Sequence, residues 1–160
     1  MNLNLSAIGK LKKGPESVLF DHYRDRISKV GGSVHIGPLI LNEMNESQAS
    51  KPGRRCEEEA EMLLSKVTAG EPIVALDESG KSLTSRAFSD YLLKMRDDGT
   101  RTLNFVIGGP DGHGPGIKNE AAMKLSLSHM TLTHGFARIL LVEQIYRALT
   151  ILLDHPYHRQ

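Results

Sequence analysis

The feature of this sequence that most restricts the fold is a predicted helix over residues 136–153 that is apolar on almost every side. Its apolar residues are Ile139, Leu140, Leu141, Val142, Ile145, Leu149, Ile151, Leu152 and Leu153. Its few polar groups, Glu143, Gln144 and Arg147, lie within about 100° of one another at 3.6 residues per turn. Such a helix must be buried on more than one face. Either a second subunit covers it, most simply in a symmetric homodimer, or it is the central helix of a monomer's core.

The length and composition of the chain fit one folded domain over residues 1–160. Of its 160 residues, 39% are hydrophobic and 24% charged, which excludes the disordered class. The single cysteine, Cys56, allows neither a disulfide framework nor a cysteine-based zinc site within one chain. No segment approaches the length of apolar sequence that a membrane span needs, and the first residues do not resemble a secretory leader. We therefore expect a cytoplasmic protein with no membrane partner.

The net charge of the chain gives no general attraction to nucleic acid. It is +1 at neutral pH, so an RNA substrate would have to be held by local clusters of positive charge. Two clusters are present: Lys10, Lys12 and Lys13 after the first predicted strand, and His155, His158 and Arg159 near the end of the chain. Each cluster, taken alone, is also typical of an ordinary solvated surface.

Short runs with strand character alternate with helical patterns along the whole chain. Strands are predicted over residues 2–7, 33–41, 72–76, 103–107 and 125–130. Helices are predicted over residues 15–30, 54–69, 84–98, 117–123 and 136–153, and residues 42–53 are predicted to be a loop. Thr84 is the expected N-cap of the third helix. This order predicts an α/β fold, an open parallel sheet with helices on both faces, and such sheets bind ligands at the carboxyl ends of their strands.

Two strand ends are the most informative places for chemistry. Leu76 and Asp77 close one apolar strand, and residues 107–112 close another with two glycines, Gly108 and Gly109. Glycines directly after a strand let backbone amides approach a ligand, although a purely structural turn has the same pattern. The segment lacks the Gly-Lys-Ser/Thr of a phosphate-binding loop and the glycine spacing of a dinucleotide-binding fold.

Several segments in a fixed order resemble the ribosomal RNA large-subunit methyltransferase H family. They are residues 7–11 (AIGKL), 105–112 (FVIGGPDG), 127–132 (LSHMTL), 138–147 (RILLVEQIYR) and 155–159 (HPYHR). The resemblance covers essentially the whole chain, which implies a single SPOUT domain without an accessory RNA-binding domain. This fold is a parallel sheet flanked by helices, whose C-terminal segment threads a loop to form a trefoil knot. The resemblance also implies a homodimer that uses S-adenosylmethionine, without a metal, to methylate N3 of a pseudouridine. That pseudouridine lies in helix 69 of 23S rRNA in the assembled 70S ribosome, and neither DNA nor a membrane is an expected partner.

The resemblance also implies roles for individual residues. The S-adenosylmethionine pocket would be lined by Leu76, Gly108, Gly109, Leu127, Ser128, His129, Met130, Thr131 and Leu132. The acceptor side needs a group that helps the N3 proton leave, and we expect Tyr157 and His158 there, with Arg159 holding phosphate and His134 in reserve. Tyr157 could instead stack on a base. Lys10, Lys12, Lys13 and Arg138 are the expected RNA contacts.

One position departs from the family pattern. The family often has proline before the histidine that corresponds to His134, whereas this chain has Thr133. A less rigid entry into the last helix would follow, which puts the placement of His134 in question.

Other functions remain open at this point. Another SPOUT methyltransferase, acting on tRNA, would share most of these features, and so would a ribosome-binding module without catalysis. A nucleotide-binding regulator could use the loop at residues 108–112. Methyl transfer to ribosomes or tRNA, and a preference for S-adenosylmethionine over ATP, distinguish these classes.

Overall fold

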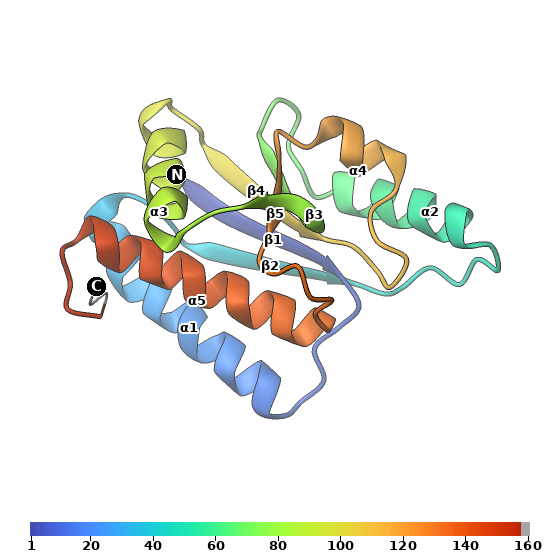
Figure 1. The fold of residues 1–160 in the computed structure, drawn as a ribbon, viewed down its shortest axis with the longest axis horizontal. Helices are drawn as coiled ribbons and strands as arrows, with labels where there is room; N and C mark the ends of the chain where they lie inside the picture. Colours follow the sequence, from blue (N-terminus) through green and yellow to red (C-terminus); the bar gives the residue numbers. More distant parts are fainter. Residues whose placement is uncertain (158–160) are drawn as a thin grey trace.

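Five parallel strands form the centre of the computed structural model, which describes residues 1–157 (Figure 1). In chain order the strands are β1 (Asn2–Ile8), β2 (Leu39–Met44), β3 (Ile73–Ser82), β4 (Thr102–Ile107) and β5 (Met123–Ser126). In the sheet their order is β2-β1-β4-β3-β5, and every neighbouring pair is parallel. The carboxyl ends of all five strands therefore lie at one edge of the sheet.

Helices cover both faces of the sheet, as the alternating sequence pattern predicted (Figure 1). They are α1 (Pro15–Gly31), the 3-10 helix η1 (Gly32–Val34), α2 (Pro52–Leu64), α3 (Ser85–Asp97), α4 (Pro115–Glu120) and α5 (His134–Leu152). α1, α3 and α5 pack on one face, and α2 and α4 pack on the other. The predicted fold class, a parallel sheet flanked by helices, is confirmed.

Strand β4 shows why the sheet is buried on both sides. Phe105 and Ile107 belong to the core beneath α1, α3 and α5, whereas Val106 belongs to the smaller core beneath α2 and α4. Successive side chains of a strand point to opposite faces, so an almost continuously apolar strand supplies both cores. This burial fixes the position of β4, and with it the position of the glycines that follow.

The bounds of several elements differ from the sequence-based prediction. The predicted strand over residues 33–41 is instead η1 followed by β2, which begins only after Pro38 and continues to Met44. α2 ends at Leu64, earlier than expected, and α4 and β5 are shorter and begin earlier than expected. β3 extends past its apolar part to Ser82, with an irregularity between Leu76 and Lys81 where it pairs with β5. Leu76, where the regular pairing with β5 ends, is therefore the last residue of β3 before the irregular part.

Most of α5 is covered within the single chain. Its buried residues include Leu141, Ile145 and Leu149, which belong to the same core as residues of α1 and α3. α1 and α5 run side by side (Figure 1), and their first turns meet, because a Cβ on Gly135 would collide with Glu16. The apolar character of this helix therefore does not by itself require a partner subunit.

Two expectations about the whole chain stay predictions: the threading of a trefoil knot and the presence of one domain over residues 1–160. Within residues 1–157, no helix is long and apolar enough to cross a membrane.

Candidate functional site

A cavity of about 950 Å³ lies at the edge of the sheet where β3, β4 and β5 end and α5 begins. Its walls come from three backbone segments far apart in sequence: residues 76–79, 107–113 and 127–134. Leu125, Lys118 and Ala137 complete the lining. A cavity of this size falls within the range typical of small-molecule sites, and the carboxyl ends of parallel strands are where α/β sheets bind ligands.

The loop after β4 depends on its glycines. A Cβ on Gly108 would lie 3.0 Å from the carbonyl carbon of Gly112, and a Cβ on Gly109 would collide with the carboxylate of Glu59. The Gly112 amide donates to the carbonyl of Gly109 (2.9 Å), and Gly112 has φ +79°, a conformation that favours glycine. The loop therefore turns back on itself, and its three glycines contribute only backbone to the cavity lining.

Helix α2 fixes the same loop from outside. Arg55 Nε donates to Asp111 Oδ2 at 2.7 Å, and this pair holds the pKa of the Asp111 carboxyl below its usual value. Glu59 is buried, and its Oε1 accepts from the backbone amide of Ser47 (3.1 Å). α2 thus connects the segment after β2 to the glycine loop, so the charged residues of this helix support the cavity rather than line it.

His113 is a wall residue that the sequence interpretation missed. Its side chain is buried, and Nε2 lies 2.9 Å from the carbonyl oxygen of Leu76, at the opposite wall. Burial is the largest effect on His113 and lowers the pKa of its imidazole, against a smaller opposite effect from the Leu76 carbonyl. The imidazole is therefore neutral at physiological pH.

The third wall, residues 127–133, is held by short polar contacts. Ser128 Oγ accepts from the amide of Met130 (2.9 Å), and the carbonyl of Ser128 accepts from Ser126 Oγ (3.0 Å). Thr131 Oγ1 donates to Glu78 Oε2 at 3.1 Å, across the cavity mouth. This contact links the wall after β5 to the extension of β3.

Thr133 is the N-cap of α5. Its hydroxyl accepts from the amide of Phe136 at 3.4 Å, and the first residue of the helix is His134. A threonine cap satisfies an amide that would otherwise lack a partner at the helix start. The departure from proline at this position is thus compatible with a defined helix start and with a His134 that lines the cavity.

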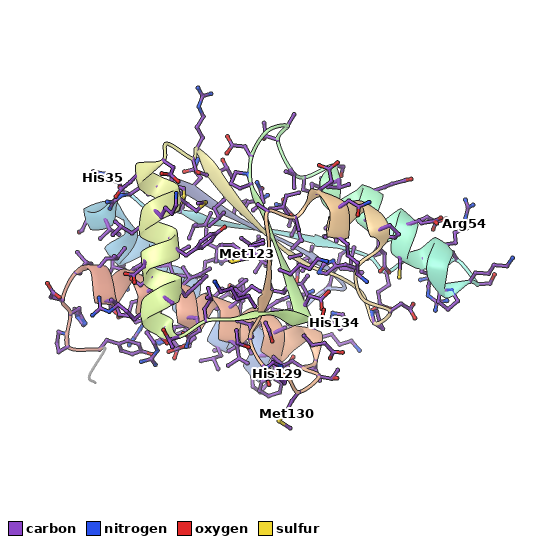
Figure 2. All side chains as sticks on the ribbon, turned by 45° about the horizontal axis from the view of Figure 1, so that its top comes forward. His35, Arg54, Met123, His129, Met130 and His134 are labelled. Atoms are coloured by element: carbon purple, nitrogen blue, oxygen red, sulfur yellow. The ribbon has the colours of Figure 1, made fainter. Side chains whose placement is uncertain are left out.

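Eight of the nine residues expected to bind the cofactor line this cavity. They are Leu76, Gly108, Gly109, Leu127, Ser128, Met130, Thr131 and Leu132. The exception is His129, which is exposed and whose Nε2 lies 3.5 Å from Ser82 Oγ. Figure 2 shows His129, Met130 and His134 near the start of α5, far from Arg54 on α2. Sequence reasoning gave no role to the acidic residues of the cavity, Asp77, Glu78 and Asp111, although Asp77 and Asp111 belong to the two strand ends that it singled out.

Tyr157 lies far from the cavity within one chain. Its hydroxyl donates to Glu143 Oε1 (3.1 Å) and lies 3.3 Å from the hydroxyl of Tyr23. Nine residues separate Glu143 from His134, which is about 13 Å along the helix axis. Burial, followed by the contact with Tyr23, raises the pKa of Tyr157 well above its usual value, so its hydroxyl is protonated at neutral pH. His158 and Arg159, the other expected acceptor-side residues of the tail, lie outside the described residues.

The expected RNA contacts divide into two groups. Lys10, Lys12 and Lys13 are exposed in the loop after β1, at the same sheet edge as the cavity. Arg138 is only 1% exposed, so the expectation that it contacts RNA is corrected to a structural role. Its guanidinium donates to the carbonyls of Ile8 (2.9 Å) and Gly9 (2.7 Å) and to Glu43 Oε1 (3.0 Å). Arg138 therefore joins α5 to the ends of β1 and β2.

No group of three or more His, Cys, Asp or Glu side chains suited to a metal ion occurs among residues 1–157.

Comparison with known proteins identifies relatives along the whole chain. A family model described as "Predicted SPOUT methyltransferase" matches residues 1–158. Proteins named "Ribosomal RNA large subunit methyltransferase H" from Brucella anthropi and Bartonella henselae are 43% and 44% identical to the chain. One of the same name from Rhizobium leguminosarum is 45% identical, and each alignment covers 99% of both chains.

A solved structure gives a much weaker likeness. The crystal structure of the SpoU methyltransferase AviRb from Streptomyces viridochromogenes, in complex with the cofactor AdoMet, matches with a TM-score of 0.40 and 11% identity. The match covers 97% of this chain and 58% of the other. The family match and the full-length relatives confirm the resemblance found in the sequence: this chain belongs to the SPOUT methyltransferase family, among the ribosomal RNA large subunit methyltransferases H.

Proposed function

We propose that this chain transfers a methyl group from S-adenosylmethionine to N3 of a pseudouridine in helix 69 of 23S rRNA, acting on the assembled 70S ribosome. The observation that carries the proposal is the cavity between the glycine loop and residues 127–134, in a chain whose full-length relatives are named ribosomal RNA large subunit methyltransferase H. The cavity would hold the methyl donor, and the acceptor base would enter at its mouth.

The residues of the cavity fit S-adenosylmethionine. Leu76, Leu127 and Leu132 supply apolar walls for an adenine ring, and Gly108 and Gly109 leave the backbone accessible to polar groups. Asp77 is held ionised, because hydrogen bonds from the hydroxyl and amide of Ser79 lower the pKa of its carboxyl. An ionised carboxylate in the lining complements a positively charged ligand. When bound, the donor supplies a methyl group already activated on a sulfonium, so the protein needs only to bind and orient.

The acceptor side requires removal of the N3 proton. His134 lines the cavity at the start of α5 and is the described residue best placed to accept that proton. Tyr157 instead contacts Glu143, which lies about 13 Å along the axis of α5 from His134. Its protonated hydroxyl makes it a poor base in this environment, which favours stacking on RNA over proton transfer. Tyr157 would act at a cavity only if a second copy of the chain brought it there, and His158 and Arg159, outside the described residues, stay proposed acceptor-side residues.

A homodimer forms part of the proposal. Val18 and Leu19 on α1 and Phe136 on α5 are 69%, 42% and 53% exposed, although all three are large and apolar. The first turns of α1 and α5 meet, so these residues belong to one end of a helix pair. A self-complementary contact through such a patch is the usual basis of a twofold dimer. It would also place two lysine loops in one assembly.

RNA binding in this proposal relies on local charge. Lys10, Lys12 and Lys13 lie at the sheet edge that carries the cavity, so a phosphate backbone bound there would bring its bases near the cavity mouth. Selection of one base would rest on the shape of an RNA loop with an unstacked nucleotide. A substrate inside the ribosome also places the protein in the cytoplasm.

The test is labelled methyl transfer from S-adenosylmethionine to three acceptors. These are 70S ribosomes from cells lacking the gene, free 23S rRNA and bulk tRNA. We expect label in 70S ribosomes and at least tenfold less in the other two. Label only in tRNA would indicate the other SPOUT function. Ribosome binding without transfer, in protein that binds no S-adenosylmethionine, would indicate a non-catalytic module.

A further inference from the structure

His113 sits where two strands of the sheet separate. β3 and β4 pair through Ile73, Val74 and Ala75, and the pairing stops one residue before Leu76. Beyond this point the two strands form opposite walls of the cavity. The imidazole of His113, which follows the glycine loop of β4, bridges the gap through the 2.9 Å contact between Nε2 and the Leu76 carbonyl.

The hydrogen-bond partners of His113 define its protonation state. A carbonyl oxygen only accepts, so Nε2 must carry the hydrogen in this contact. Nδ1 has no hydrogen-bond partner and is inaccessible to solvent, while the side chain as a whole is 6% exposed. Nδ1 also lies close to the backbone, since a Cβ built on Gly108 would be 3.1 Å from it. The site therefore accommodates a neutral imidazole and has no acceptor for a hydrogen on Nδ1.

We infer that His113 is a positioning residue for methyl-donor binding: as the neutral Nε2–H form it ties Leu76 of β3 to the glycine loop, and protonation of Nδ1 disrupts this tie. The inference rests on the proposed function, because it concerns the same cavity. His113 need not touch the ligand. Its hydrogen bond sets the distance between Leu76 and Gly108, on two walls of the cavity. The hydrogen bonds between β3 and β4 end before these residues and do not fix that distance.

Protonation of His113 has a defined cost. A proton on Nδ1 would create a buried donor without an acceptor, beside backbone that cannot withdraw without moving the loop. Burial lowers the pKa of His113, and Lys118 of α4 and Lys124 of β5 act in the same direction. Asp77 of β3 and the Leu76 carbonyl oppose it.

The pH dependence follows from the direction of this shift. The unfolded chain binds the proton below about pH 6.5, where the folded chain still resists it. The stabilising effect of neutral His113 is therefore fully present above that pH and is lost as the pH falls through the window below it. Ligand binding that requires the neutral form weakens in the same direction.

The experiment measures the Kd of S-adenosylmethionine by calorimetry on the full chain between pH 5.5 and 8.0. The proteins are wild type, His113→Gln, His113→Leu and the exposed control His22→Gln. Glutamine can donate a hydrogen bond from its amide at the position of Nε2 but does not titrate. Leucine has neither a donor nor a titratable group. Steady-state methylation of ribosomes at pH 7.5 then separates KM for S-adenosylmethionine from kcat.

The expected results differ for each protein. Binding of S-adenosylmethionine to wild type and to His22→Gln weakens as the pH falls from 7.5 to 5.5, by less than about tenfold because the pKa of His113 lies below its usual value. The Kd of S-adenosylmethionine for His113→Leu is about tenfold higher than that of wild type at pH 7.5 and changes little with pH. Its KM for S-adenosylmethionine is raised, and its kcat stays within twofold of wild type. The Kd of His113→Gln stays within about threefold of the wild-type Kd at pH 7.5, and it no longer depends on pH as the wild-type Kd does.

Contrary outcomes are equally distinct. A His113→Leu variant with wild-type Kd, or a His113→Gln variant with the full wild-type pH dependence, overturns the inference and leaves the proposed function standing. If His113→Leu fails to fold, as judged by circular dichroism, the pH profile of His113→Gln decides. Wild type that binds no S-adenosylmethionine at any pH removes both proposals, whereas a His113-dependent Kd without ribosome methylation removes only the proposed substrate.

Discussion

Replacing Arg138 by methionine removes the guanidinium that joins α5 to the ends of β1 and β2. The guanidinium makes three hydrogen bonds of 2.7–3.0 Å, to the carbonyls of Ile8 and Gly9 and to Glu43 Oε1. Methionine keeps much of the apolar stem but offers no donor, so the two carbonyls lose their partner. Glu43 retains the hydrogen bond from the amide of Leu11 at 2.8 Å.

The magnitude follows from burial. Removing one member of a buried ion pair typically costs about 3–5 kcal/mol, and an orphaned buried acceptor about 1–3 kcal/mol. The Arg138 side chain is 1% exposed and the Glu43 side chain 23% exposed. The two buried carbonyls therefore bear the full cost of losing their donor, whereas water can partly replace the arginine at the carboxylate. We expect a loss of about 3–5 kcal/mol in the free energy of unfolding, which for a chain of this length lowers Tm by about 6–20 °C.

Thermal unfolding by circular dichroism at one fixed protein concentration measures this loss. The matched control is Arg24→Met, because Arg24 forms an exposed pair with Asp21 at 2.9 Å. Exposed pairs contribute little, so Tm of the control should change by less than about 2 °C. If Arg138→Met melts within 3 °C of wild type, the reasoning on this buried cluster is wrong.

Three further predictions concern the cavity and its surroundings. Gly109→Ala should raise the Kd of S-adenosylmethionine more than about tenfold in calorimetry, because the added methyl collides with Glu59, whereas Gly53→Ala, with open space around it, should not; equal Kd values would contradict this. Replacing the three lysines of the β1 loop by alanine should weaken ribosome binding and lower the slope of log K against log salt by about 2 in filter binding, and an unchanged slope would exclude these lysines from the RNA contact. Thr133→Ala should cost about 1 kcal/mol in urea unfolding through loss of the α5 cap, and no change in the unfolding midpoint would contradict that role.

The sequence contained the fold class because local signals and tertiary structure agree in most elements. Thr84 caps α3 as expected, accepting from the amide of Ala87 at 3.1 Å, and β4 lies where its apolar run predicts. In β1, apolar residues alternate with polar ones, yet both faces of the strand are buried. Asn4 is buried in the structure and pairs with Asn104 (2.9 Å) and Asn42 (2.6 Å). Side-chain amides that satisfy one another across strands cannot be recognised from periodicity.

The site was predictable only in part, for a physical reason. Its backbone walls follow from strand ends and glycines, which are local signals, and the resemblance supplied residues 127–132. The roles of His113, Glu59 and Arg138 depend on contacts between distant segments, such as His113 with Leu76 and Arg138 with Gly9. Nothing in the local pattern distinguishes a buried arginine that joins strand ends from an exposed one that binds phosphate.

The most direct test of the central claim is to locate the methyl group. Ribosomes from cells lacking the gene are incubated with the protein and S-adenosylmethionine, and the helix 69 fragment of 23S rRNA is digested and analysed by mass spectrometry. We expect one added methyl, on N3 of a pseudouridine in that fragment, and none when the protein is omitted. An unmodified helix 69, with the methyl on another nucleotide or on tRNA, would contradict it.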